Sequence, residues 1–259
     1  SPLNSSMKKL LIIVFLFSCF ISLAQEDKRT KIIVRTKAKD AKFIGTSMGG
    51  SMIILRDALT DEILAKGLTN GGTGNTDLIM NAPVERTTDI TEGSAYYEAS
   101  LYLSKPKFIT VQALSPVNHE ESRVFAQTQV WMIPGKHMDA AGIVLDIPGF
   151  VVEGLYPQTH QGFSIETDKT IELKVNLVMM CGCPITKGGL WDSEEIEVEG
   201  MIYVNGAYWK TISMSIAETN TFTAALTLEK TGSHEVIITA YHPRTKNTGV
   251  DQLNFRVSN

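Results

Sequence analysis

Apolar and polar side chains alternate along most of this chain, and that period-two pattern is the feature that most limits its fold. It is clearest in residues 170–179, where one face is apolar and the other is polar. The apolar set is Ile171, Leu173, Val175, Leu177 and Met179, and the polar set is Glu172, Lys174 and Asn176. Successive side chains of a β-strand point to opposite faces, so this segment predicts a half-buried strand. Short runs of this kind recur with turn signals between them, which predicts an all-β sandwich fold.

The alternating runs fall into two groups, which predict two tandem β-sandwich domains. The first domain is expected to cover residues 28–154, with a strand at 95–103 and a Gly-rich loop at 70–75. The second is expected to cover residues 163–259. It contains Asn205-Gly206, a strong hairpin signal, which is expected to join strands at 195–204 and 208–216.

The N-terminal residues 7–24 have the pattern of a secretory signal peptide. Lys8 and Lys9 precede an apolar run, and the small-x-small pattern ends at Ala24, where cleavage is expected. Cys19 offers an alternative, a lipid anchor in a lipobox-like context. We therefore expect an exported protein, periplasmic or at the cell surface. No later segment approaches the length of a transmembrane span.

The charge balance bears on the partners that this chain can bind. The 24 Lys and Arg residues against 28 Asp and Glu residues give a net charge of -4. Nucleic acids and anionic membranes attract basic surfaces, so this balance gives no case for either. We expect a protein, glycan or metal partner. The aromatic residues that were considered for a glycan or peptide surface are Tyr96, Tyr102, Trp131, Tyr208 and Trp209.

Two segments resemble known families of β-sandwich. Residues 226–257 contain Gly232, an alternating run 236–241, the turn 247–249 and a final strand. This segment resembles the end of a bacterial immunoglobulin-like domain. It departs from that pattern at His242, where an acidic residue is common, which argues against a calcium role taken from relatives.

Residues 52–71 resemble the transthyretin-like or carboxypeptidase-regulatory-like β-sandwich, through Leu55-Arg56-Asp57, Thr60-Asp61, Ile63-Leu64-Ala65 and Gly67-Leu68-Thr69. Both resemblances imply a scaffold that binds rather than a reaction, and a fold alone does not assign a function.

A Cys-Gly-Cys loop follows the clearest strand and is the sharpest candidate site. Met180, Cys181 and Cys183 bring soft sulfur ligands together, which suit copper or zinc, and His160 is the imidazole expected to complete the site. His137 and His242 are the other imidazoles considered. Two alternatives stay open: a redox-active disulfide between the cysteines, and inert buried thiols.

Residues 45–49 spell Gly-x-Ser-x-Gly, the nucleophile elbow of α/β-hydrolases, with Ser47 as nucleophile. Asp139 or Asp146, followed by His160, would complete a triad. The surrounding alternation argues against the strand–turn–helix context that this chemistry needs. The sequence therefore favours an exported non-catalytic binding module with a soft-metal site. A structural or adhesive surface module and a Cys-x-Cys thiol oxidoreductase are the alternatives.

Overall fold

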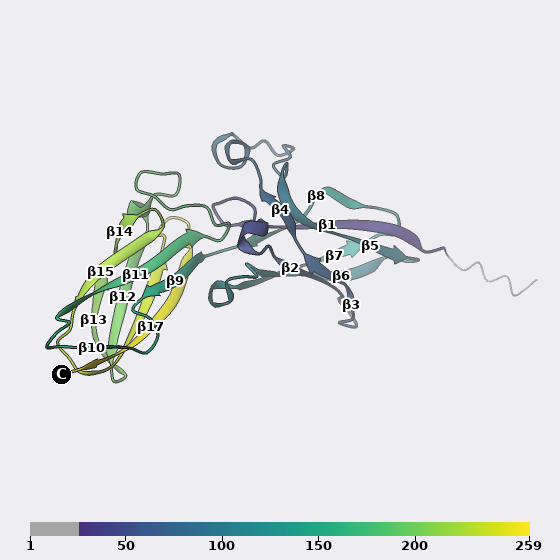
Figure 1. The fold of residues 1–259 in the computed structure, drawn as a ribbon. Helices are drawn as coiled ribbons and strands as arrows, with labels where there is room; N and C mark the ends of the chain where they lie inside the picture. The colour runs from purple at the N-terminus through teal and green to yellow at the C-terminus, as the bar shows by residue number, and fades with distance from the viewer. Residues whose placement is uncertain (1–25) are drawn as a thin grey trace, which may run out of the picture.

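The structure is a computed structural model that describes residues 26–259, and most of these residues lie in β-strands (Figure 1). The expected signal peptide, residues 7–24, and the alternative lipid anchor at Cys19 lie outside the described residues. Within 26–259, no helix is both long enough and apolar enough to cross a membrane. The prediction of an all-β fold is confirmed.

The first sandwich consists of two four-stranded sheets, with the orders β4-β5-β1-β8 and β3-β2-β6-β7. Strand β1 pairs antiparallel with β5 and parallel with β8. The short helical turns are η1 (Thr46–Met48), η2 (Asp77–Asn81) and η3 (Glu120–Ser122). The strands are β1 (Lys28–Ala38), β2 (Met52–Asp57), β3 (Ile63–Leu68), β4 (Asn70–Thr73), β5 (Ser94–Leu103), β6 (Lys107–Ser115), β7 (Val124–Met132) and β8 (Met138–Ile147).

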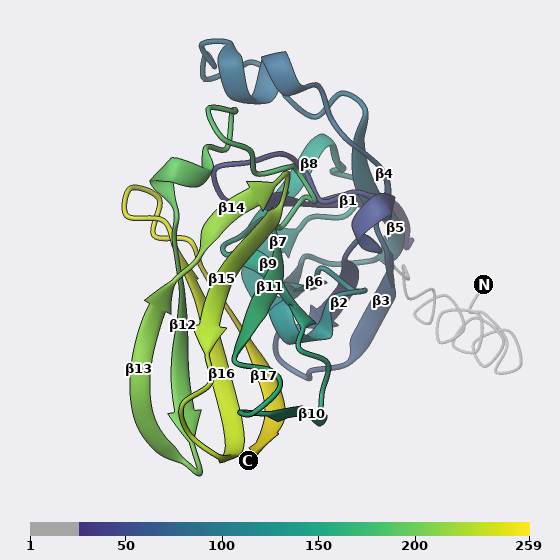
Figure 2. The same ribbon diagram turned by 60° about the vertical axis from the view of Figure 1, so that its left-hand side comes forward.

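The second sandwich packs a four-stranded sheet, β14-β15-β11-β9, on a five-stranded sheet, β10-β17-β16-β12-β13 (Figure 2). These orders correspond to strands A-B-E-D and A′-G-F-C-C′ of an immunoglobulin domain, which confirms the predicted fold. The turn η4 (Ser193–Glu195) precedes β12. The strands are β9 (Phe150–Tyr156), β10 (Gln161–Ser164), β11 (Thr170–Met179), β12 (Glu197–Val204), β13 (Ala207–Ser213), β14 (Ser215–Glu218), β15 (Thr221–Thr227), β16 (Gly232–Tyr241) and β17 (Thr248–Ser258).

The alternating positions form the cores, as predicted. The alternating residues Ile171, Leu173, Val175, Leu177 and Met179 of β11 are all buried. The core of the second sandwich also includes Ala41, Ile44 and Met48, which come from the loop after β1 in the first sandwich. The two sandwiches therefore share packed hydrocarbon where they meet end to end (Figure 1).

Three local expectations differ from the structure. The segment 70–75, expected to be a loop, begins with strand β4, which pairs with β5. The run 208–216, expected to be one strand, is divided between β13 and β14, which belong to different sheets, because an immunoglobulin chain changes sheets at this point. Strand β9 precedes the expected boundary at 154–163, yet it pairs with β11 of the second sandwich. The chain leaves the first sandwich earlier, at Pro148-Gly149.

Candidate functional site

The Cys-Gly-Cys loop follows β11 and lies at the junction of the two sandwiches. Cys181 and Cys183 form a disulfide with Cα atoms 5.4 Å apart, and both residues are buried. Gly182 between them has a left-handed backbone with φ of +75°. Its N–H donates to the carbonyl of Met179 at 2.7 Å, so the loop is a tight turn at the end of the strand.

Methionine side chains surround this turn. Met48 of the first sandwich lies against Gly182, so close that a Cβ on that glycine would lie 2.6 Å from its sulfur. Met180 is buried and its methyl group packs beside Gly149 in the segment between the sandwiches. The turn is therefore part of the packing that joins the two sandwiches.

The structure brings together Met180, Cys181 and Cys183, but not His160. His160 lies in the turn before β10, where its N–H donates to the carbonyl of Asn254 at 2.9 Å. Met180 lies near the opposite end of β17. Its methyl group packs beside Gly149, which in turn lies against the carbonyl of Thr248, the first residue of β17. Six residues of strand separate Thr248 from Asn254, about 20 Å.

The other imidazoles have partners of their own. His137 accepts the N–H of Lys31 at 3.1 Å, and His242 pairs with Glu195 at 3.3 Å. Among residues 26–259, no group of three or more His, Cys, Asp or Glu side chains is placed to hold a metal ion. Metal binding at the Cys-Gly-Cys loop stays a prediction.

Ser47 lies in η1, a single 3-10 turn, and its side chain is exposed. The chain continues from this turn into strand β2 rather than into an α-helix. The strand–turn–helix context of a nucleophile elbow is therefore missing at Gly45–Gly49.

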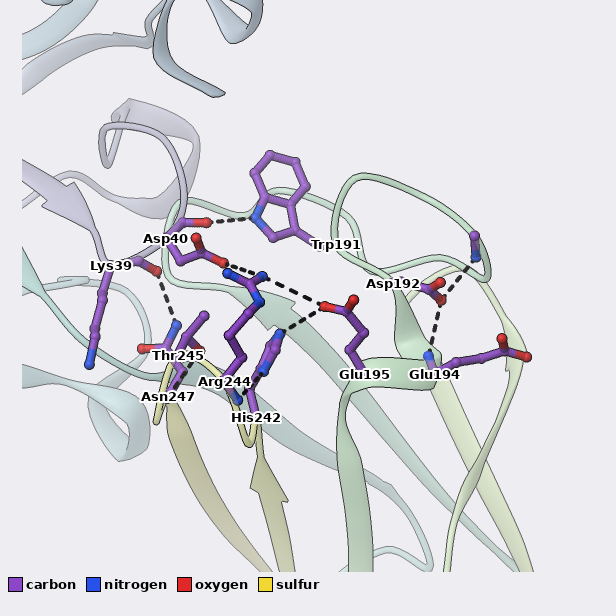
Figure 3. A network of polar contacts seen from close by, with 11 residues as sticks. Lys39, Asp40, Trp191, Asp192, Glu194, Glu195, His242, Arg244, Thr245 and Asn247 are labelled. Atoms are coloured by element: carbon purple, nitrogen blue, oxygen red, sulfur yellow. Dashed lines mark hydrogen bonds and ion pairs between the residues drawn. The ribbon is translucent and has the colours of Figure 1, made fainter. Parts of the chain in front are cut away.

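A polar network links the two sandwiches beside the Cys-Gly-Cys turn (Figure 3). Asp40, after β1, accepts the indole N–H of Trp191 on its carbonyl at 2.9 Å, and its carboxylate pairs with Arg244 at 3.4 Å. Asn247 is fully buried; its amide donates to the carbonyl of Lys39 at 3.0 Å and accepts the N–H of Gly149 at 2.8 Å.

These contacts come from the β11–β12 and β16–β17 loops of the second sandwich. The same loops form the ligand-binding end of immunoglobulin variable domains. Here Asp40 and its neighbours in the first sandwich occupy that end, so these loops are engaged within the chain itself.

The outer face of the β3-β2-β6-β7 sheet carries several exposed apolar side chains. The strand registers place Leu68, Met52, Leu114 and Phe125 side by side in one row that crosses all four strands. Ile54 and Ile63 lie in the rows that follow, and Phe108 and Trp131 form the last row, with ring centroids 5.0 Å apart. We call these eight residues the apolar outer face.

Polar side chains fill the middle of this face and bond to one another. Arg56 donates to Gln112 at 3.0 Å, Gln112 donates to Gln127 at 3.4 Å, and Gln129 donates to Thr110 at 3.1 Å. These side chains thus form hydrogen-bonded rows across the strands. The rows lie between the apolar row that ends at Phe125 and the row of Phe108 and Trp131. Antiparallel sheets usually present a polar face to water, so an apolar row on the solvent side indicates a binding surface.

The opposite outer face of the same sandwich shows the ordinary pattern. Strands β1 and β5 present Lys31 and Glu98 there, paired at 3.2 Å, together with Arg29 and Tyr102. Charged and polar side chains therefore alternate on this face with Ile33, Tyr96 and Val144. The two outer faces of the first sandwich therefore differ in the kind of side chain they present to solvent.

Of the eight residues of the apolar outer face, only Trp131 was identified from the sequence as a candidate surface residue. The other aromatic residues considered with it lie elsewhere: Tyr96 and Tyr102 on β5, and Tyr208 and Trp209 on β13. The run 107–115 does indicate this face in the sequence, because both of its alternating sets contain apolar residues. Phe108 and Leu114 belong to one set, and Ile109, Val111 and Ala113 belong to the other.

One buried imidazole lies outside every surface described so far. His234 on β16 is fully buried, stacks on Phe255 at 5.0 Å between ring centroids, and has no hydrogen-bond partner for its Nε2 within the described residues. Loss of hydration lowers the pKa of His234, and the nearby carbonyl of Gly232 opposes that shift. A neutral imidazole among aromatic rings is a core residue here.

No protein-family model matches the chain, and no curated protein matches it. Among solved structures, an engineered protein is similar over 49% of this chain and 24% of its own, with 12% identity and a TM-score of 0.32. The fibronectin(III)-like modules of Clostridium thermocellum CbhA are similar over 88% of this chain and 94% of theirs, with 10% identity and a TM-score of 0.28.

A third similar structure is the CARDB domain of PF1109 from Pyrococcus furiosus, over 42% of this chain and 96% of that domain, with 18% identity and a TM-score of 0.26. This chain covers about a quarter of the engineered protein. Scores at this level assign no family and carry no function to the chain. The fold class rests on the strand order, and the resemblance of residues 52–71 to transthyretin-like domains stays a prediction.

Proposed function

We propose that this chain is an exported, non-catalytic binding module that docks an apolar, uncharged protein surface on its apolar outer face. The observation that carries the proposal is the row of Leu68, Met52, Leu114 and Phe125, which crosses four strands on the solvent side. Export is supported by the leader pattern at 7–24 and by the paired cysteines, since disulfides persist in oxidising compartments.

The composition of the face favours a protein partner over a glycan. Five of its eight residues are aliphatic, counting Met52. Two charged side chains lie in the rows between them: Arg56 is bonded to Gln112 and Asp61, and Lys66 is exposed on the edge strand β3 beside Ile54. The cores of protein interfaces lack charge and are enriched in aromatic residues, Met and Arg. A sugar-binding face needs free hydrogen-bond donors beside its rings, and here the Gln112 amide donates to Gln127 and the Gln129 amide donates to Thr110.

Phe125→Ser should weaken partner binding by roughly tenfold or more, because exposed aromatic side chains dominate interface energies. Tyr102→Ser is the matched control, an aromatic side chain that is more exposed than Phe125 and lies on the opposite face, and should leave binding unchanged. The measurement is site-specific photo-crosslinking from Gln127 in cells that export the chain, with Glu172 of the second sandwich as the control position.

One saturable product that joins the chain at Gln127 to a different protein, absent from Glu172 and lost in Phe125→Ser, is the expected result. The absence of any product that depends on Phe125 would refute the proposal. Affinity electrophoresis tests the glycan alternative. If a neutral polysaccharide retards the chain, and Trp131→Ala abolishes the retardation, the partner is a glycan rather than a protein.

A second candidate function is the binding of a soft metal by the reduced Cys-Gly-Cys loop. It is supported by the sulfur atoms of Met48, Met180, Cys181 and Cys183, which the junction gathers in one place. Thiolates and thioethers prefer Cu(I) and related soft ions, whereas a disulfide supplies no thiolate.

The chain should therefore carry no copper when oxidised and about one Cu(I) after reduction and loading, a stoichiometry typical of a single soft site. Cys181→Ser combined with Cys183→Ser should abolish the bound copper, as elemental analysis with thiol counting would show. His160→Ala should not change the stoichiometry, since His160 lies at the far end of β17. A reduced chain that holds no metal would end this idea.

A further inference from the structure

The four sheets formed by residues 26–259 have eight edge strands, and seven of these carry a feature that opposes pairing with another chain. Natural edges are protected by short length, charged residues, glycine or bulges. Three edge strands, β4, β10 and β14, are four residues long. The remaining four protected edges, β3, β8, β9 and β13, each contain a charged residue and an irregular register.

Strand β7 is the exception among the described residues. It is nine residues long, contains no charged residue, proline or glycine, and pairs with β6 in an unbroken register. Gln127, Thr128 and Gln129 are all exposed, although Thr128 points to the inner side of the sheet. Both sides of the strand's middle are therefore open at this edge, and its outward backbone groups can accept another strand.

The sequence of β7 reads almost the same in both directions about Thr128. Val124 corresponds to Met132, Phe125 to Trp131, Ala126 to Val130 and Gln127 to Gln129. An antiparallel pair of identical strands related by a two-fold axis brings each residue opposite its mirror position. Centred on Thr128, aromatic rings would face aromatic rings and amides would face amides, pairs that stabilise antiparallel sheets.

We propose that β7 is a self-association edge: two copies of this chain pair their β7 strands antiparallel about Thr128 to form one eight-stranded sheet. The inference goes beyond the proposed binding function and does not depend on it, because it concerns the edge of the sheet rather than its face. Neither copy brings a charge to the axis, so no repulsion opposes the pairing.

The pairing would extend the apolar outer face across the axis. The row that ends at Phe125 would continue into the partner's Trp131, and the row that ends at Trp131 would continue into the partner's Phe125. A strand of nine residues is about 30 Å long, which makes a small interface when only an edge is buried. The dimer should therefore be weak and concentration-dependent.

Sedimentation of the full chain from roughly 1 µM to 1 mM, the range of weak dissociation constants, should show a monomer that becomes a dimer. Thr128→Lys and Thr128→Glu should each stay monomeric over the same range, since like charges would lie directly opposite one another. An equimolar mixture of the two variants should restore the dimer, because opposite charges then meet at the axis.

Cysteine cross-linking tests the register separately. Thr128→Cys should form a disulfide-linked dimer on oxidation, because directly opposed residues have Cα atoms about 4.5–5.5 Å apart. Thr211→Cys, an exposed threonine on the protected edge strand β13, should not. A wild-type chain that stays monomeric throughout, or a mixture of Thr128→Lys and Thr128→Glu that does not pair, overturns the proposal.

Discussion

Gly182→Ala should lower the free energy of unfolding by roughly 2–4 kcal/mol, through a left-handed backbone and a crowded contact. Gly182 has a φ of +75°, which a Cβ disfavours, and that Cβ would lie 2.6 Å from the sulfur of Met48. Met48 belongs to the first sandwich and Gly182 to the second. The substitution therefore acts on the packing between the sandwiches, and urea unfolding of the oxidised chain would measure its cost.

Gly188→Ala provides the matched control in the same loop. Its φ is +65° and no atom lies within 4 Å of an added Cβ, so it should cost roughly 1–2 kcal/mol from the backbone alone. Met48→Ala should cost less in the Gly182→Ala background than in the wild type, with a coupling of roughly 0.5–2 kcal/mol. Equal costs for Gly182→Ala and Gly188→Ala would show that Met48 does not press on the turn.

The sequence alone was enough to predict the strands, because burial in a sandwich imposes a period of two on each of them. Residues 170–179 show this directly, since each apolar residue in the alternating series is buried. Errors arose where the pattern does not encode the pairing. Strand β4 contains Gly71 and Gly72, which have no side chain to alternate, and the change of sheet between β13 and β14 occurs within one continuous alternating run, residues 208–216.

The sites were harder to predict than the strands. The two cysteines stand out in the sequence, but their position in the junction depends on the contact between Met48 and Gly182, more than 130 residues apart in the chain. No local pattern reports such a contact. Likewise the apolar outer face exists only once the register aligns Leu68, Met52, Leu114 and Phe125 in one row. The near-palindrome of β7 was legible in the sequence, but its meaning depends on β7 being an edge strand.

Asn247→Ala should destabilise the chain by roughly 2–4 kcal/mol, because the buried N–H of Gly149 and the part-buried carbonyl of Lys39 would lose their partners at once. The Asn247 amide bonds the carbonyl of Lys39 at the end of β1 and the N–H of Gly149 between the sandwiches. No other hydrogen-bond partner of the Gly149 N–H is found among the described residues. Water reaches this position poorly, since the Asn247 side chain is fully buried.

Hydrogen exchange distinguishes this effect from a general loss of stability. The Gly149 amide should lose its protection in Asn247→Ala at denaturant concentrations where the amides of β11 remain protected, because the junction would open before either sandwich unfolds. Asn254→Ala is the control, since its side chain accepts only from Gln252 at the sheet surface, and its cost should stay below about 1 kcal/mol. If Gly149 and the β11 amides lost protection together, the two sandwiches would unfold as one unit and Asn247 would not act as a local link between them.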